Sequence, residues 1–326
     1  MKKIILIPLG DAAGIGGELI AKAIQKNENI RNAKVVIVGD KKVFEKALDI
    51  VGVKCEYDVL YSKEEIKKTV CNIALYDTKS IKHDVLFGHV DPELGREEKE
   101  NLLFCCQLCE EGYAHGICFA PLNKAAMKLG GMNFNSEHEL LENYFNLKTP
   151  SGEINYLNGL YTSRVTSHIP LSEVYKKINS STLGNAILLI FETLKKSGVK
   201  SPRIAVSALN PHCGENGTCG KEENDIIIPT INAFKNNGMN VVGPISADVI
   251  FIDAFEKYDA IVTMYHDQGQ IAMKLYNFEK GVTIVGGMPF PITTPAHGTA
   301  YDIAGQGICN SEAFETAFEL CVKMIK

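Results

Sequence analysis

Three histidines each follow a short apolar run that has the pattern of a buried β-strand. His168 follows "YTSRVTS", His212 follows "RIAVSALNP" and His266 follows "AIVTMY". Ligands of open α/β sheets collect beyond the carboxyl ends of the strands, so side chains from separate strand ends can converge there. One histidine at such a position is more often structural, but three imidazoles suit Zn²⁺ or a similar divalent ion and leave positions open for a substrate. The sequence therefore indicates a candidate metal site.

The segment "MYHDQGQIAMK" (264–274) places further polar groups directly after the apolar run 260–263. It carries His266, Asp267 and Lys274. Removing such groups from water is costly unless a cation and the groups themselves compensate one another. The pattern favours a functional strand end.

Three glycine-rich segments suggest that a ligand approaches the backbone closely: "GDAAGIGGELI", "NPHCGENGTCGKEE" and "PAHGTAYDIAGQG". The first leads from a predicted strand into a predicted helix, where backbone amides can receive a phosphate or a substrate. It lacks the G-x-G-x-x-G spacing of a Rossmann dinucleotide site. A tight turn that needs Gly14 and Gly16 for packing explains this segment equally well, and both interpretations stay open.

Short apolar runs alternate with amphipathic stretches along most of the chain. The runs predict strands and the stretches predict helices. Strands are expected at 2–9, 33–40, 203–209 and 258–265, and helices at 16–27, 41–52, 181–198 and 221–238. This alternation predicts an α/β protein with a largely parallel sheet.

Composition and charge narrow the class of protein. The 326 residues suffice for two domains at roughly 150 residues each. A net charge of −5 without a basic block makes neither nucleic acid nor an anionic membrane an expected partner. No apolar run is long enough to span a bilayer, and Gly10 and Asp11 interrupt the apolar start, unlike a signal peptide. We therefore expect a cytoplasmic protein.

The cysteines are expected to be reduced. Cys106 and Cys109 have C-x-x-C spacing within a helical pattern that also holds Cys105, but no second pair or nearby histidine completes a zinc site. Buried thiols that pack as small hydrophobes in a reducing compartment are the interpretation we favour.

Motifs along nearly the whole chain resemble those of the PdxA family, the 4-hydroxythreonine-4-phosphate dehydrogenases. They are, in family order, "GDAAGIGGE", "APLNKAAM", "TSHIPL", "LNPHCGENG", "GPISADVIF", "MYHDQG" and "HGTAYDIAGQG". The last also resembles the nucleotide-binding loop of isocitrate and isopropylmalate dehydrogenases, which bind NAD without a Rossmann motif. The resemblance implies their two-domain fold, with largely parallel sheets and an active-site cleft between the domains. The first domain would comprise 1–128 plus 298–326, and the second, 129–297, would carry the metal site and the dimer interface.

The resemblance also implies roles for individual residues in a homodimer with shared active sites. The implied metal ligands are His168, His212 and His266, supplied across the dimer interface. The implied catalytic residues are Lys274, Asp248 and Asp267. The implied cofactor-binding residues are Gly298, Thr299, Ala300, Asp302 and Gly305. Asn210 and the pair Asn123–Lys124 fall in motifs that line the cleft in such proteins.

These residue types together suit a metal-dependent, NAD(P)-linked dehydrogenase. A divalent metal lowers the pKa of a bound hydroxyl, and a hydride can then pass to a nicotinamide held against the substrate. Lys274 and a nearby aspartate are candidates for proton transfer. Decarboxylation would follow if the new ketone lay β to a carboxylate. NAD or NADP, and Zn, Mg, Mn or Co, all stay open.

Departures from the family pattern fall at substrate positions. Glu137 and His138 stand where the family has a His-Thr pair, and Thr283 and Ile292 stand where it usually has an Asn and an Arg. Isoleucine cannot replace the bidentate guanidinium that recognises a phosphate. We count these four residues, with Lys274 and Asn210, as candidate substrate-binding residues. The pattern predicts diverged recognition of a hydroxy acid or diol that is less anionic, although a one-residue shift of His138 would restore a contact.

Two other functions compete with the dehydrogenase. A phosphate acyltransferase shares the broad fold, although the strand-end histidines and the "HGTAYDIAGQG" loop argue against it. A non-catalytic protein that binds a metal or a nucleotide would also explain the altered substrate positions.

Overall fold

The computed structural model describes residues 3–325. Its contacts divide the chain into two compact units, Met1–Leu147 with Met288–Lys326, and Lys148–Gly287. We refer to them as unit 1 and unit 2. The boundaries proposed from the resemblance, after residue 128 and before residue 298, assign 129–147 and 288–297 to the other domain.

Unit 1 contains a parallel sheet. Its strands, in spatial order, are β3 (Asp58–Leu60), β4 (Ile73–Asp77), β2 (Lys34–Gly39), β1 (Ile4–Pro8), β5 (Gly116–Cys118) and β12 (Ile292–Pro295). All five residues of β1 are buried. Such a continuous apolar run is typical of a parallel strand covered on both faces.

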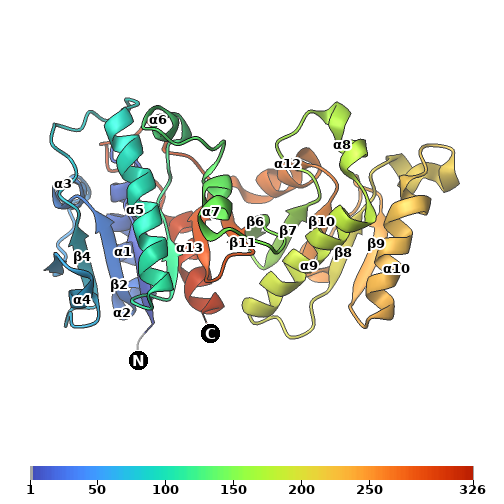
Figure 1. Ribbon diagram of the computed structural model, residues 1–326, viewed down its shortest axis with the longest axis horizontal. Coiled ribbons are helices and arrows are strands. Elements are labelled where there is room, and N and C mark those ends of the chain that lie inside the picture. Colours follow the sequence, from blue (N-terminus) through green and yellow to red (C-terminus); the bar gives the residue numbers. More distant parts are fainter. Residues whose placement is uncertain (1–2, 326) are drawn as a thin grey trace. The chain divides into compact units, whose positions relative to one another are not determined.

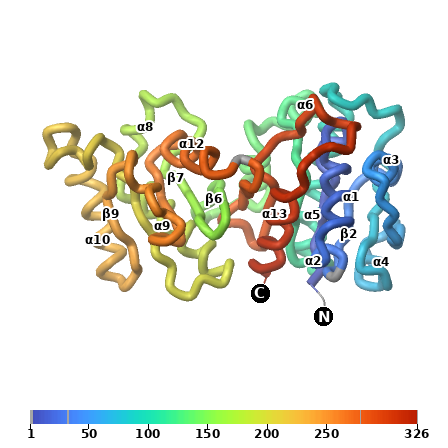
Figure 2. Tube along the Cα trace, turned by 180° about the vertical axis from the view of Figure 1, so that it is seen from behind, coloured from blue at the N-terminus to red at the C-terminus, as the bar shows by residue number. Residues whose placement is uncertain are grey.

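Helices cover both faces of this sheet. The helices of unit 1 are α1 (Gly16–Lys26), α2 (Glu28–Asn32), α3 (Lys41–Val51), α4 (Lys63–Ile66), α5 (Pro92–Glu110), α6 (Lys124–Leu129), α7 (Glu137–Phe145) and α13 (Glu312–Met324). Helix α5 lies in front of the strands in Figure 1, and α1 and α3 lie in front of them in Figure 2, seen from behind. Asp40 begins α3 because its carboxylate accepts the N–H of Lys42, and Gly52 ends it in a left-handed conformation.

Unit 2 contains a mixed sheet. Its strands, in spatial order, are β11 (Val282–Gly286), β6 (Gly152–Leu157), β7 (Leu160–Arg164), β10 (Ala260–Thr263), β8 (Ile204–Ser207) and β9 (Val241–Ile245). The β11–β6 and β6–β7 pairs are antiparallel, and the remaining pairs are parallel. Its helices are α8 (Leu171–Lys177), α9 (Ser180–Lys196), η1 (Pro211–Gly217), η2 (Glu223–Ile227), α10 (Ile228–Asn236), α11 (Ala254–Lys257), α12 (His266–Asn277) and η3 (Phe278–Lys280).

Alternation along β7 sends neighbouring side chains to opposite faces of this sheet. Ser163 points toward α9, where its hydroxyl donates to the carbonyl of Ala186. Arg164 points to the other face and donates to Asn155 on β6, which also accepts from Gln270 of α12. Helices α9 and α12 therefore cover opposite faces, and the α12 face carries the polar side chains.

The elements expected from the sequence are present, so the prediction of an α/β protein with largely parallel sheets is confirmed. The expected helix 221–238 begins with a π-helical turn, η2, before α10. Cys105, Cys106 and Cys109 are buried and free, as expected. Within residues 3–325, no helix combines the length and the apolar character needed to cross a membrane.

Candidate functional site

The structure brings His168 and His266 together. Each follows one of two neighbouring parallel strands, β7 and β10, so their carboxyl ends meet at one edge of the unit 2 sheet. The ring centroids are 5.5 Å apart and the rings are tilted by 46°. The Nδ1 of His266 lies 2.7 Å from an Asp267 carboxylate oxygen. A carboxylate on one ring nitrogen fixes the orientation of the imidazole and leaves Nε2 for a ligand.

His212 lies in an unusual backbone conformation after β8. From His212 to Asn216 every residue is left-handed, with φ between 44° and 75°. This costs roughly 1–2 kcal/mol for each residue other than glycine. The buried carboxylate of Glu223 supports the loop by accepting the N–H groups of Leu209 and Asn210 at 2.9 and 2.8 Å. Strain that the surrounding structure maintains in this way is typical of a functional loop.

The three predicted ligands do not form one site within the chain as described. In residues 3–325, no three or more His, Cys, Asp or Glu side chains are arranged to hold a metal ion. The imidazoles of His168 and His266 supply two of the nitrogen ligands that a divalent-metal site needs. The donor types therefore suit the ion, but a third ligand has to be added to the pair.

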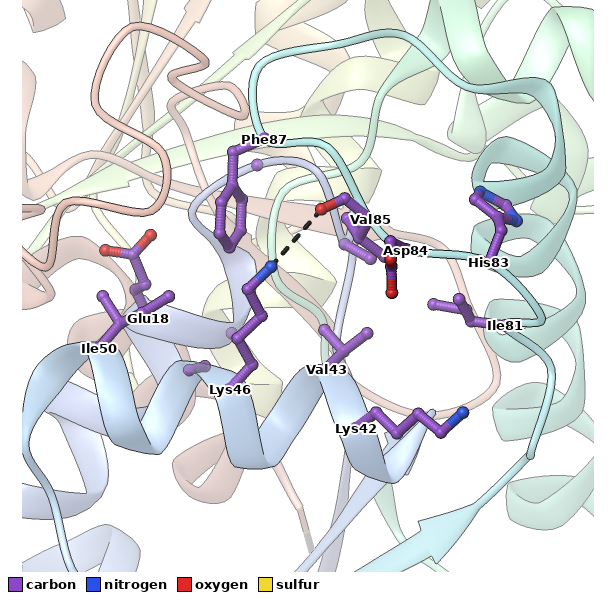
Figure 3. Close-up of a pocket in the computed structure, with 14 residues that line it drawn as sticks. Glu18, Lys42, Val43, Lys46, Ile50, Ile81, His83, Asp84, Val85 and Phe87 are labelled. Atoms are coloured by element: carbon purple, nitrogen blue, oxygen red, sulfur yellow. Dashed lines mark hydrogen bonds between the residues drawn. The ribbon is translucent and has the colours of Figure 1, made fainter.

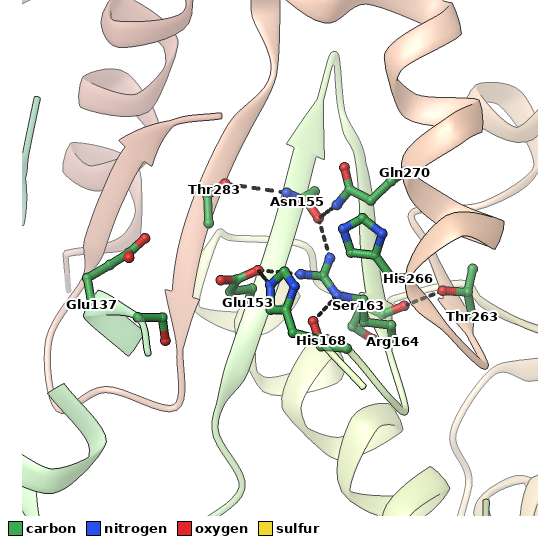
Figure 4. Close-up of polar contacts among 12 residues, drawn as sticks. Glu137, Glu153, Asn155, Ser163, Arg164, His168, Thr263, His266, Gln270 and Thr283 are labelled. Carbon is green, nitrogen blue, oxygen red and sulfur yellow. Dashed lines mark hydrogen bonds and ion pairs between the residues drawn. The ribbon is translucent and has the colours of Figure 1, made fainter. Parts of the chain in front are cut away.

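A polar network that the sequence prediction missed lies beside His168, whose side chain is 65% exposed (Figure 4). Arg164 donates to Asn155 and Ser167, both at 2.9 Å, and to the carboxylate of Glu153. That carboxylate lies 4.0 Å from the Nε2 of His168. Burial lowers the pKa of Arg164, and the charge of Glu153 opposes this effect. The available signal was the polar pair Glu153 and Asn155, two residues apart in an otherwise apolar strand and hence on one face.

The predicted cofactor segment, 298–305, is fixed to the β1–α1 loop within unit 1. The carbonyl of Thr299 accepts the N–H of Ile15 at 3.1 Å, and a Cβ at Gly14 would lie 2.8 Å from that of Thr299. Glu18 of α1 accepts the N–H groups of Gly305 and Gly307 at 2.6 and 2.7 Å. Gly14 is therefore needed for close packing against this segment, as the structural interpretation of the first glycine-rich motif requires, and ligand binding by the same motif stays a prediction.

A second polar cluster lies beside this segment and consists of Asp11, Glu98, Asn123 and Tyr301. The buried Asp11 carboxylate accepts hydrogen bonds from Asn123 and Tyr301. One Glu98 oxygen accepts the N–H of Asn123 at 2.6 Å, and the other is buried without a partner. Burial, and then repulsion by Asp11, raise the pKa of Glu98 to about 9. Burial also raises the pKa of Asp11.

A cavity of about 590 Å³ including its open mouth adjoins the same turn. Figure 3 shows Lys46 reaching between Phe87 and Val85; its ammonium lies 4.4 Å from the Phe87 ring centroid. Glu18, which holds Gly305 and Gly307, also lines the cavity, as do Lys42 and the apolar residues Val43, Ile50, Ile81 and Val85. Apolar walls with two lysines suit a ligand that combines a flat apolar group with an anion.

Two predicted substrate residues of unit 1 have partners on its own helices. The Glu137 carboxylate lies 3.4 Å from the ammonium of Lys124. The Nε2 of His138 lies 3.2 Å from Glu142, one turn along α7. Ile292 is fully buried in β12, in register with Ile117. Its side chain therefore has no exposed surface for a ligand.

The remaining predicted residues lie in unit 2. Thr283 of β11 accepts a 3.4 Å hydrogen bond from Asn155, which joins it to the Arg164 network. Asn210 donates to Glu222 and Glu223 at 2.7 and 2.9 Å. Asp248 and Lys274 are exposed.

Comparisons with known proteins show the family to which the chain is similar. The model of the family "Pyridoxal phosphate biosynthetic protein PdxA" matches residues 31–321. A Pseudomonas aeruginosa protein provisionally named 4-hydroxythreonine-4-phosphate dehydrogenase 2 is 40% identical over 321 residues, 97% of this chain and 95% of the relative. An Oceanobacillus iheyensis protein provisionally named D-threonate 4-phosphate dehydrogenase is 38% identical over 326 residues, 98% of each chain.

A solved structure shares both fold and sequence. The crystal structure of 4-hydroxythreonine-4-phosphate dehydrogenase from Klebsiella pneumoniae has a TM-score of 0.87 and 32% identity, and the match covers 99% of this chain and 98% of that one. Matches of this identity over nearly the full length of both chains show common descent, which confirms the resemblance seen in the motifs. The chain therefore belongs to the PdxA family.

Proposed function

We propose that this protein is an NAD(P)-linked dehydrogenase that oxidises a hydroxyl group of a phosphorylated hydroxy acid. The observation that carries the proposal is the 5.5 Å separation of His168 and His266 in a chain whose full-length relatives are named as dehydrogenases. Those names specify 4-hydroxythreonine 4-phosphate and D-threonate 4-phosphate. Both molecules combine a carboxylate, a phosphate and a hydroxyl that can lose a hydride.

The residues of this chain would divide the chemistry between them. His168 and His266, with His212 from a second copy, would hold a divalent ion, which when bound lowers the pKa of the substrate hydroxyl. The hydroxyl proton would pass to Lys274 or Asp248, and the hydride on the same carbon to the nicotinamide, leaving a carbonyl group. Residues 298–305 would bind the cofactor. If the carbonyl lies β to the carboxylate, CO₂ leaves in a following step.

An exposed apolar surface on unit 2 supports the homodimer in this proposal. It comprises Val249, Ile252, Ile271 and Leu275, which are exposed by 45, 57, 60 and 83%. The Tyr276 hydroxyl donates to the carbonyl of Phe251, so α12 and the 249–252 turn lie side by side. Contiguous exposed apolar side chains of this kind mark association surfaces. Since α12 begins at His266, a second copy at this surface would lie close to the histidine pair.

The charge at the altered substrate position is compatible with a phosphorylated substrate, which the relatives' names also specify. Glu137 would repel a phosphate if it stood alone. Lys124, at 3.4 Å, offsets this charge, so the pair as a whole does not repel a phosphate. We therefore place the phosphorylated acids ahead of the less anionic hydroxy acids and diols.

A substrate panel tests the proposal. Both phosphorylated acids and their unphosphorylated forms are assayed with NAD and NADP, with Zn²⁺, Mg²⁺, Mn²⁺ or Co²⁺, by absorbance of the reduced nicotinamide and by CO₂ release. We expect turnover of a phosphorylated acid that the variant His266→Ala loses and the surface variant His89→Gln keeps. Absence of reduction with every substrate contradicts the proposal. Acyl-CoA formation would favour the acyltransferase, and metal binding without turnover would favour the binding protein.

A further inference from the structure

Arg164 is a buried cation at the end of β7. Its side chain is only 6% exposed. All three guanidinium nitrogens donate hydrogen bonds: Nε to Ser167, one terminal nitrogen to Asn155 and the other to Glu153. A charge taken out of water is destabilising unless a counter-charge and hydrogen bonds compensate it. Four polar residues therefore lie together at the end of β7.

The partner carboxylate faces an imidazole as well as the guanidinium. The Glu153 oxygen that accepts from Arg164 is the same atom that lies 4.0 Å from the Nε2 of His168. Figure 4 shows the carboxylate of Glu153 and the ring of His168 side by side. Because Arg164 restrains this oxygen, the negative charge beside the ring has a fixed position.

The network also reaches the helix that carries the second histidine. Asn155, which accepts from Arg164, accepts in addition from Gln270, one turn after His266 on α12. A structural ion pair would need only Arg164 and Glu153. This one connects the two strand ends whose histidines meet at 5.5 Å.

We propose that Glu153, held in place by Arg164, is a positioning residue that places a fixed negative charge beside His168 and so favours the binding of a divalent cation there. The inference rests on the proposed function, in which His168 binds that cation. Carboxylates that accept a hydrogen bond from a ligating histidine strengthen metal binding, and their loss typically weakens it by about 10–100-fold. Glu153 lies 4.0 Å from the Nε2 of His168, beyond hydrogen-bond distance, and acts through its charge. The role belongs to unit 2 alone and does not depend on which substrate is oxidised.

Calorimetric titration of the metal-free protein with Zn²⁺ tests this role without any enzyme assay. Glu153→Gln keeps the shape of the side chain and an oxygen for Arg164 but removes the charge. We expect it to weaken Zn²⁺ binding by about 10–100-fold and to change the absorption spectrum of the Co²⁺-loaded protein. Glu153→Asp, which keeps the charge, should recover part of the affinity. Glu173→Gln is the matched control, because Glu173 belongs to the same unit, its side chain is 42% exposed and it pairs with Lys176 at 2.8 Å.

The possible results separate this inference from the proposed function. If Glu153→Gln binds Zn²⁺ as tightly as the parent and only its Tm falls, the pair is structural and the inference is wrong. If the parent protein binds no Zn²⁺, Mn²⁺ or Co²⁺, the metal-dependent function fails, and the positioning role fails with it. Glu153→Gln keeps an oxygen for Arg164 but leaves the buried guanidinium without its counter-charge, so its Tm should fall. Glu153→Asp keeps the counter-charge, so its Zn²⁺ affinity relative to the parent decides the question if Glu153→Gln does not fold.

Discussion

The two units each bury a polar cluster beside predicted ligand-binding residues, but they neutralise it in different ways. In unit 2 the Glu153 carboxylate has the Arg164 guanidinium as its partner. In unit 1 Asp11 and Glu98 have only neutral donors, and no described lysine or arginine contacts either carboxylate. The first cluster keeps its charges by pairing them. The second lowers its charge by retaining a proton, since burial raises the pKa of Glu98 to about 9.

This difference teaches what each cluster can do. A fixed ion pair presents a permanent negative charge, which suits a place beside cation-binding imidazoles. A protonated carboxyl beside a carboxylate carries less negative charge than two carboxylates would. This suits a position next to a segment predicted to bind an anionic dinucleotide. Removing one partner should therefore change the free energy of unfolding by different amounts in the two clusters. The loss should be large where a charge is left alone and small where the charge is already neutralised.

Arg164→Met should have the largest effect. It leaves the carboxylate of Glu153 and the oxygen of Asn155 without their donor, and breaking a buried pair in this way costs about 3 kcal/mol. Urea unfolding measures the loss. Arg203→Met is the control in the same unit, because Arg203 is 44% exposed in its pair with Asp259 and should cost at most about 1 kcal/mol. Equal losses in the two variants would show that burial does not distinguish the pairs.

Glu98→Gln should be mild and should change the pH dependence of stability. Because the pKa of Glu98 is about 9 when folded and 4.5 ordinarily, the folded protein keeps a proton that the unfolded chain releases between these values. Below pH 4.5 the free energy of unfolding of the parent should therefore contain the full contribution of protonated Glu98. Above that pH it should fall as the pH rises, by at most about 1.4 kcal/mol per pH unit. Glutamine removes this contribution.

The measurement is urea unfolding of the parent and the variant at several pH values from about 5 to about 8.5, which lie between the ordinary and the folded pKa of Glu98. The variant should gain stability relative to the parent as the pH rises. Glu100→Gln is the matched control, an exposed position two residues along the same helix, and should leave the slope unchanged. A constant difference between parent and Glu98→Gln at all pH values would show that Glu98 is ionised when folded.

Tyr301→Phe should have an intermediate effect on unit 1. It removes the hydroxyl that bonds Asp11 and Asn123, which costs about 1 kcal/mol. Because Tyr301 lies within the predicted cofactor segment, we also expect a several-fold increase in the KM for NAD or NADP with unchanged Zn²⁺ affinity. Tyr144→Phe, which removes a single hydrogen bond to Glu110 in the same unit, is the control. A changed Zn²⁺ affinity in Tyr301→Phe would argue against separate roles for the two clusters.

The sequence was a good guide where local patterns determine structure. Apolar periodicity located β1, α1, β10 and α9 to within a few residues. Strand ends followed by histidine predicted that His168 and His266 could converge, since neighbouring parallel strands end at one edge. The same reasoning could not join His212 to them, because its position depends on a left-handed loop that no periodicity encodes.

Long-range pairing was the part that sequence could not reveal. Arg164 and Glu153 meet because β6 and β7 form an antiparallel pair, and the register of that pair is not written in either strand alone. Asp11 and Tyr301 are 290 residues apart. Glu137 alone would repel a phosphate, but Lys124 lies beside it through the packing of two segments that are separated along the chain.

Thr283→Val should have the smallest effect and should show where the unit 2 cluster ends. Thr283 accepts one long hydrogen bond, 3.4 Å, from Asn155, so its loss should cost at most about 0.5 kcal/mol. Asn155 is still held by Arg164 and Gln270, and Zn²⁺ affinity should therefore be unchanged. If Thr283 contacts the substrate, the KM for the phosphorylated acid should change while the KM for the cofactor does not. A loss of Zn²⁺ affinity as large as that of Glu153→Gln would mean that the network acts on His168 as a whole, and that the charge of Glu153 is not what matters.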